Sequence, residues 1–166
     1  YVDLQFSKTE VATITKVYGV IMTLVGAALG GVLVMRFGTL RILFLGAVLT
    51  ASTNLLFALL NEVGHDLELL TLIISLDNLS AGIATAAFVT YLSSLTNVAF
   101  SATQYALFSS IMLLMPKLLA GFSGQVVEQI GYSSFFVGTS LLGIPVMILI
   151  IMVAKRGDAL LPQADK

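Results

Sequence analysis

Residues 69–95, LLTLIISLDNLSAGIATAAFVTYLSSL, decide the fold class of this chain. The stretch is apolar enough to cross a bilayer, and as a helix it would be about 40 Å long, which exceeds the roughly 30 Å hydrocarbon core of a membrane. It nevertheless carries Asp77 and Asn78 well inside the apolar run. A carboxylate in hydrocarbon is costly, so such residues usually face the interior of a helix bundle or a wet cavity. We therefore interpret residues 69–95 as a membrane helix that lines a path through a bundle.

The composition of the whole chain supports the membrane assignment. Of its 166 residues, 58% are hydrophobic and 10% are charged, and the mean hydropathy is +1.02. Soluble domains have about 25% charged residues. The sequence has no cysteine and a single histidine, His65, which excludes a disulfide framework, a thiolate metal site and a multi-histidine metal centre within this chain. The net charge of −1 and the lack of a basic patch argue against nucleic acid as a partner. We expect the lipid bilayer as a partner, and no cofactor or metal.

Five apolar runs predict five membrane spans, so we expect an all-α membrane protein, a polytopic helical bundle. The predicted spans are residues 8–35, 42–60, 69–95, 102–124 and 133–153. The order Ser7-Lys8-Thr9-Glu10 has the capping-box pattern of a helix start. Residues 1–6 are expected to end a preceding membrane helix or its loop, residues 7–154 to form the bundle, and residues 155–166 to be a tail. Because the chain opens inside such a segment, we expect it to be a fragment.

The distribution of Lys and Arg predicts the orientation of the bundle. With five spans, Arg36, Arg41, Lys155 and Arg156 share one side, whereas the other side has only Lys8 near a helix end. Basic residues close to span ends favour the cytoplasm. We therefore expect the join at residues 36–41 and the C-terminal tail in the cytoplasm, and the polar loop at residues 61–68 outside.

Three charged side chains inside the predicted spans are the candidates for chemistry. Lys16, Asp77 and Lys117 lie on three different helices and, by their distances from the helix ends, in the outer half of the membrane. At similar depth they could form an ion-paired cluster, which would lower the cost of burying each charge. The functional interpretation is coordination of a solute or a proton. The structural alternative is a salt bridge, or lysine side chains that reach the interface.

Smaller polar residues and glycines accompany these charges. Asn78 and Thr85 share a strip of their helix with the acid, and Thr23 shares a small-residue stripe of the first span with Gly26 and Gly30. We therefore add Asn78, Thr85 and Thr23 to the candidate path. The pattern Gly26-x-x-x-Gly30 permits close helix packing, either inside the bundle or in a dimer.

An enzyme is not expected. Residues 121–124 read Gly-Phe-Ser-Gly, the string that carries the nucleophile in rhomboid intramembrane proteases. A serine nucleophile needs a base to take its proton, and no histidine follows His65, for which a solvated surface position is expected. Nothing in the sequence places Lys117 beside Ser123 in an oxyanion-binding site.

Residues 31–41, GVLVMRFGTLR, resemble the signature loop of the major facilitator superfamily, G-x-x-x-D-[RK]-x-G-[RK]-[RK]. Gly31, Arg36, Gly38 and Arg41 match that pattern, and Met35 stands where the family has aspartate. A longer resemblance covers residues 7–31, 76–110 and 120–136, which look like the second half of AmpG-type muropeptide permeases of that superfamily. Those proteins carry an acid-Asn-Leu-x-x-Gly string, here residues 77–82, and a Ser-Ala-Thr-Gln-aromatic-Ala-Leu segment, here residues 101–107.

The resemblance implies a proton-coupled transporter of the bacterial inner membrane, with twelve or more spans, that imports anhydro-muropeptides during peptidoglycan recycling. It implies that the helices carrying Lys16, Asp77 and Lys117 line the path and that residues 42–60 and 133–153 are peripheral. It further implies a five-span C-terminal lobe whose partner is a missing N-terminal half, because two-lobed transporters form their site between lobes. The alternatives are a transporter for another solute, such as a sugar or a drug, and a non-transporting membrane scaffold subunit.

Overall fold

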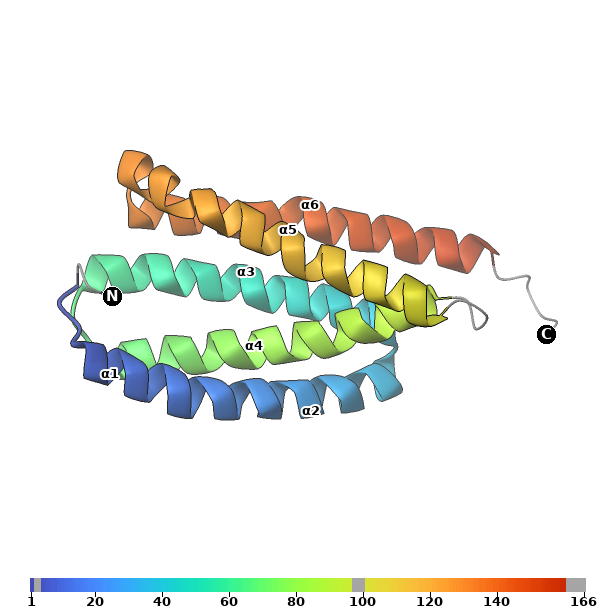
Figure 1. Ribbon diagram of the computed structural model, residues 1–166, viewed down its shortest axis with the longest axis horizontal. Helices are drawn as coiled ribbons and strands as arrows, with labels where there is room; N and C mark the ends of the chain where they lie inside the picture. The colour runs from blue at the N-terminus through green and yellow to red at the C-terminus, as the bar shows by residue number, and fades with distance from the viewer. Residues whose placement is uncertain (2–3, 97–100, 161–166) are drawn as a thin grey trace.

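The structure, a computed structural model, describes residues 1, 4–96 and 101–160 as a set of long helices. In chain order these are α1 (Lys8–Thr13), η1 (Ile14–Gly19), α2 (Val20–Phe37), α3 (Thr39–Val63), α4 (Leu67–Ser94), α5 (Ser101–Ile130) and α6 (Tyr132–Leu160). The first three elements form one continuous helix, so five helices are long and apolar enough to cross a membrane (Figure 1). No strand occurs in the described ranges. The predicted all-α membrane bundle with five spans is confirmed.

Glycines with a left-handed backbone separate consecutive helices. Gly38, Gly64 and Gly131 have φ values of 87°, 91° and 77°, a region that favours glycine. The N–H of each glycine donates to the carbonyl oxygen four residues earlier, at 2.8–2.9 Å, and so caps the helix that has just ended. The joins are therefore short, and the helices continue past their predicted ends. The join predicted at residues 36–41 is reduced to Gly38, and α6 continues to Leu160.

Side-chain caps fix the starts of two spans. The Ser7 N–H donates to Glu10 Oε2 at 2.8 Å and the Glu10 N–H donates to Ser7 Oγ at 3.2 Å, which is the predicted capping box. At the start of α4, Asp66 Oδ1 accepts from the Leu69 N–H at 2.9 Å. These caps satisfy backbone donors that a helix start leaves without a partner. They explain why the first span and α4 begin where they do.

Helix α4 lies at the centre of the packed helices. It packs along α2 on one side and along α3 on the other, and α3 also packs against α6 (Figure 1). Helix α5 has limited contact with α4 and α6 and exposes most of its described side chains. The stretch from which the fold class was inferred therefore holds three neighbouring helices together. Residues 42–60, which the resemblance placed at the periphery, have packed neighbours on two sides.

Glycines bring α2 and α4 into backbone contact. A Cβ atom at Gly26 would overlap the carbonyl oxygen of Leu79, and one at Gly82 would overlap the carbonyl oxygen of Thr23. A Cβ at Gly30 would lie 2.9 Å from the backbone of α4. Small residues permit such close approach in membrane bundles. The Gly26-x-x-x-Gly30 pattern thus serves packing inside the bundle, one of the two uses that the sequence left open.

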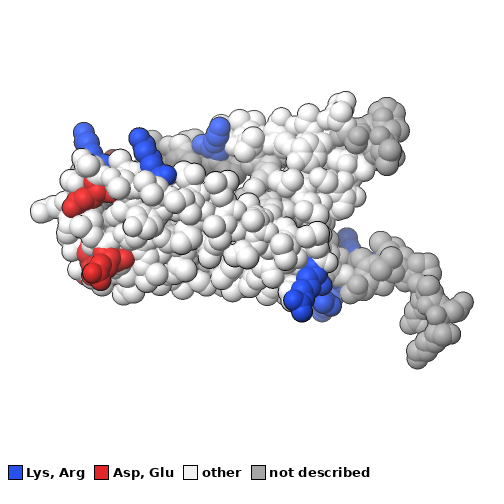
Figure 2. Space-filling view, turned by 90° about the horizontal axis from the view of Figure 1, so that it is seen from below, with Lys and Arg blue, Asp and Glu red and all other residues white. Residues whose placement is uncertain are grey.

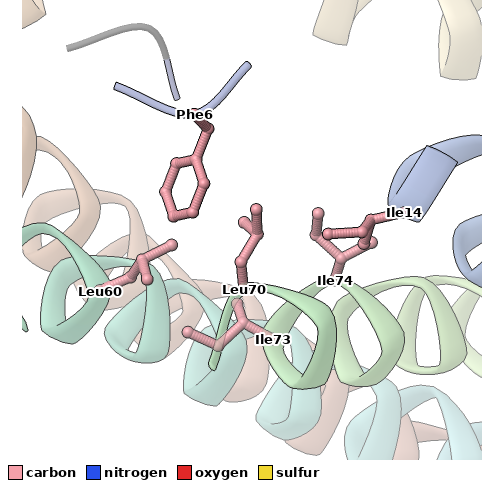
Figure 3. Packing of buried hydrophobic residues seen from close by; sticks show 6 residues of the cluster. All are labelled: Phe6, Ile14, Leu60, Leu70, Ile73 and Ile74. Atoms are coloured by element: carbon pink, nitrogen blue, oxygen red, sulfur yellow. The ribbon is translucent and has the colours of Figure 1, made fainter. Parts of the chain in front are cut away.

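A hydrophobic cluster closes one end of the packed helices (Figure 3). Its buried side chains come from the N-terminal segment, the first span, α3 and α4, and are Phe6, Ile14, Leu60, Leu70, Ile73 and Ile74. Phe6 precedes α1 and packs among the side chains of α3 and α4 (Figure 3). Burial of a phenylalanine contributes about 1.5–3 kcal/mol. The cluster therefore fixes the segment before α1 over the ends of these two helices.

His65 also holds this segment in place. The histidine is exposed, as a surface position predicts, but its ring stacks on Phe6 with the ring centroids 4.3 Å apart. Its Nδ1 atom lies 3.2 Å from the carbonyl oxygen of Leu4. The role of His65 in the fold is thus to connect the join between α3 and α4 with the N-terminal segment.

Candidate functional site

Asp77 and Asn78 are adjacent on α4 and bond to different neighbouring helices. Asp77 Oδ1 accepts a hydrogen bond from Thr53 Oγ1 of α3, with the oxygens 2.8 Å apart. Asn78 Oδ1 accepts a hydrogen bond from Thr23 Oγ1 of α2, at 3.1 Å. Successive residues of an α-helix point about 100° apart, so one turn of α4 reaches both neighbours. Two consecutive polar residues therefore join three helices at one depth.

Thr53 is the partner that the sequence analysis missed. Only 4% of its surface is exposed, and its hydroxyl satisfies a carboxylate oxygen in an otherwise apolar contact between α3 and α4. A hydrogen bond to a charged group contributes about 1.5–3 kcal/mol. The sequence has Thr50, Ser52 and Asn54 close by. Nothing in a single sequence selects Thr53 from these neighbours.

A π-helical segment adjoins Asn78. Its residues Ile14 and Gly19 are buried, whereas Lys16 is exposed. A Cβ atom at Gly19 would lie 3.3 Å from Asn78 Nδ2, so the absence of a side chain lets the amide approach this segment. π-helical turns are rare in proteins, but those that do occur are often found at functional sites. The apolar pattern of the first span gave no sign of this widened turn.

The two candidate lysines lie on the exposed surface. Lys16 projects from η1 and Lys117 from α5, next to Pro116 inside that helix. Within the part of the chain that the structure describes, neither lysine forms an ion pair with Asp77. The ion-paired cluster considered from the sequence is therefore not formed. The ion pair does not form because Thr53 holds the carboxylate of Asp77 on the α3 side of α4.

Charged side chains have a clear distribution along the bundle (Figure 2). Acidic side chains gather at one end of the long axis, basic side chains gather near the opposite end, and further basic side chains stand along one long edge. The acidic end carries Glu62, Asp66 and Glu68, and the basic end carries Arg36, Arg41, Lys155 and Arg156. Away from the basic end, Lys8 of α1, Lys16 of η1 and Lys117 of α5 are exposed. We refer to these three exposed lysines together as the lysine edge.

Thr85 lies apart from the other candidates. It lines a cavity of about 580 Å³ between α3, α4, α5 and α6, whose wall is mostly apolar. Thr50, Asn54 and Thr139 are among its few polar wall residues. The structure thus brings Thr23 and Asn78 together, places Asp77 one residue away, and puts Thr85 on a different surface of α4.

The signature loop forms the tight join between α2 and α3. Gly38 supplies its left-handed turn, and the guanidinium carbon of Arg36 lies 5.5 Å from the ring centroid of Phe37. Arg36 and Arg41 are exposed, and Met35, at the position of the family's aspartate, is 81% exposed. The basic residues of this loop therefore face outward at the basic end of the bundle.

Comparisons with known proteins give consistent results. The sequence pattern of the Major Facilitator Superfamily matches residues 1–165. A Rickettsia felis protein named transporter AmpG 4 is 33% identical over 156 residues, which cover 94% of this chain and 38% of that protein. The Rickettsia prowazekii protein named transporter AmpG 3 is 33% identical over 141 residues, which cover 85% of this chain and 34% of that protein.

The name of a third relative states the solute that it transports. The anhydromuropeptide permease of Escherichia coli strain K12 is 32% identical over 147 residues, which cover 89% of this chain and 30% of that protein. The chain therefore spans between 30% and 38% of the length of these curated relatives.

Proposed function

We propose that this chain, which belongs to the Major Facilitator Superfamily, is part of a transporter that imports anhydro-muropeptides across the inner membrane of a bacterium. Membership in a superfamily of transporters places this multi-pass membrane protein among transporters of small solutes and not among enzymes. The choice of solute is supported by the relatives, one of which is named an anhydromuropeptide permease and others AmpG transporters.

The observation that carries the proposal is the depth of the exposed lysines. Lys117 lies 16 residues after Ser101 and 13 before Ile130, about 20–24 Å from either end of α5. Lys16 lies eight residues after Lys8, about 12 Å into the first span. An ammonium group that faces hydrocarbon at these depths is costly. The lysine edge therefore suits a water-filled path far better than lipid.

A path along this edge needs a second wall. The curated relatives are about three times as long as the part that this chain matches. Transporters of this kind bind their solutes near the bilayer midplane, between structural repeats. In our proposal the rest of the transporter supplies the opposite wall, and the lysine edge faces it across the path.

Each candidate residue has a role in this proposal. Lys16 and Lys117 contact the solute, and Thr23 and Asn78 contribute polar groups at one level between α2 and α4. Thr85 contributes a hydroxyl from another surface of α4. Asp77 is the proton carrier, with Thr53 as its partner in the state described here, because an acid inside a membrane bundle is suited to a proton relay. Symport with protons would then link the pH gradient to accumulation of the solute.

The proposal includes an orientation. The join that contains Gly31, Arg36, Gly38 and Arg41 faces the cytoplasm together with the C-terminus, and the acidic end faces outward. Support comes from the concentration of Lys and Arg at one end of the bundle (Figure 2) and from the preference of such residues for the cytoplasmic side.

Uptake by reconstituted liposomes tests the function. The full-length protein should take up labelled anhydro-muropeptide above the level of protein-free liposomes, and faster when the outside is more acidic. Excess unlabelled solute should compete, whereas a free sugar or a hydrophobic drug should not. Competition by the sugar or the drug, with no muropeptide uptake, would identify a different solute. Absence of uptake for all three would favour the scaffold alternative.

A further inference from the structure

An open groove runs along the first span at the lysine edge. It has a volume of about 450 Å³ and is lined by Lys8, Thr9, Ala12, Thr13, Lys16 and Val17. Its polar donors are two ammonium groups and two hydroxyl groups. An ammonium group offers three donors and no acceptor, and a hydroxyl offers one donor. The groove therefore presents hydrogen-bond donors and positive charge to whatever occupies it.

The acids of the described residues do not neutralise this groove. Asp77 is held on the far side of α4 by Thr53, and Glu10 is bonded to Ser7 in the helix cap. No ion pair to Lys8 or Lys16 is present among the described residues. Two positive charges at one groove, with no carboxylate of the described residues paired to them, match an anionic ligand.

Lys117 supplies a third exposed ammonium group. It projects from α5, a helix that packs loosely on its neighbours. Lys8 is at the start of the first span, Lys16 about two turns further along it, and Lys117 near the middle of α5, so the three ammonium groups lie at different levels of their helices. Such a spacing suits an extended molecule with more than one negative group.

We infer that the groove at Lys8, Thr9, Thr13 and Lys16 binds a carboxylate of the solute's peptide portion, and that Lys117 receives a second carboxylate. This inference rests on the proposed function and adds to it the chemical group that the lobe recognises. A carboxylate has about four acceptor sites, which the ammonium and hydroxyl donors of the groove can fill together. A peptide always ends in such a group unless it is amidated.

Transport kinetics of the full-length protein in liposomes test the inference. The probes are labelled anhydro-muropeptide with free carboxylates and the same compound with its carboxylates amidated. Lys16→Gln should raise KM for the acidic compound by about ten-fold or more, the loss expected for a charge-assisted hydrogen bond. It should leave KM for the amidated compound within about two-fold. Lys16→Arg should retain most of the affinity because it retains the charge, and Lys155→Gln, at the opposite end, serves as the matched control.

A binding measurement separates this inference from the proposed function. A labelled tripeptide with two free carboxylates, and no sugar, is titrated into the full-length protein in detergent. Loss of tripeptide binding in Lys16→Gln supports the carboxylate site even when the wild-type protein transports no muropeptide, a result that would refute only the proposed function. Equal KM values for the acidic and amidated compounds in the wild type, together with unchanged kinetics in Lys16→Gln, would overturn the inference and leave the proposed function standing.

Discussion

Gly26→Ala is expected to push α2 away from α4, because the added Cβ would overlap the carbonyl oxygen of Leu79. That oxygen belongs to the backbone of α4, so no rotation of a side chain relieves the overlap and the helices themselves must move. Overpacking of this kind costs about 1–3 kcal/mol. The same change removes a glycine from a helix interior, which by itself stabilises by about 0.5–1 kcal/mol.

Gly31→Ala separates these two effects. Gly31 lies five residues further along α2, and a Cβ atom there meets nothing within 4 Å. Both variants share the gain in helix propensity, so the difference between them measures the packing cost at Gly26, about 1–3 kcal/mol.

Thermal unfolding of the full-length protein in detergent provides the assay. A cost of 1 kcal/mol corresponds to a change of about 2–4 °C in Tm for a domain of 150–250 residues, and to roughly half of that for a protein twice as long, because the entropy of unfolding grows with length. Gly26→Ala should therefore melt about 1–6 °C below Gly31→Ala, and Gly31→Ala should melt at or slightly above the wild type. Equal melting temperatures for the two variants would refute the close approach of α2 and α4.

Three further predictions concern the polar residues and the orientation. Thr53→Val preserves the side-chain volume but removes the donor to Asp77, so it should lower the free energy of unfolding by about 1.5–3 kcal/mol. Thr53→Ser keeps the hydroxyl and should melt close to the wild type, whereas an unchanged Tm in Thr53→Val would mean that the hydrogen bond contributes little. Asp77→Asn retains an oxygen that can accept the hydrogen bond from Thr53, so the variant should fold and exchange solute at equilibrium. In liposomes it should no longer accumulate solute when a proton gradient is applied. Normal accumulation would show that Asp77 does not carry the proton. A cysteine at Glu68 should react with an impermeant thiol reagent added to intact cells and one at Arg41 only after permeabilisation, and the opposite labelling pattern would invert the proposed orientation.

The features that the sequence predicts well are those set by local chemistry or by the membrane. Five apolar runs are long enough to cross a bilayer, and a chain in lipid must satisfy its backbone by forming helices there. The capping box at Ser7 and Glu10 involves residues three apart, so its geometry follows from the start of the helix alone. Helix ends were less well predicted, because Gly38, Gly64 and Gly131 let each helix continue to the turn itself.

The features that the sequence could not provide depend on which helix faces which. Asp77 was recognised as unusual, but its partner on α3 is set by the packing of α4 between two neighbours, and Thr53 lies among several similar polar residues. Thr85 shares a strip with Asp77 on a helical projection, yet it lines a separate apolar cavity where α3, α5 and α6 approach α4. The π-helical turn at Lys16 arises where the first span meets Asn78, and no apolar period marks such a contact.

The separation of the acid from the lysines has a consequence for coupling. An acid paired directly with Lys16 would keep its charge, because an adjacent ammonium favours the carboxylate form. Asp77 instead accepts a hydrogen bond from the neutral hydroxyl of Thr53, so a change at this carboxyl group would not leave a lysine without its partner. On the proposed function, protonation of Asp77 would change the contact that its side chain makes with Thr53 of α3. The next residue, Asn78, maintains the contact of α4 with α2 beside the segment that carries Lys16. The proton and the solute would then act at neighbouring residues of one helix, and α4 would be the element that links them.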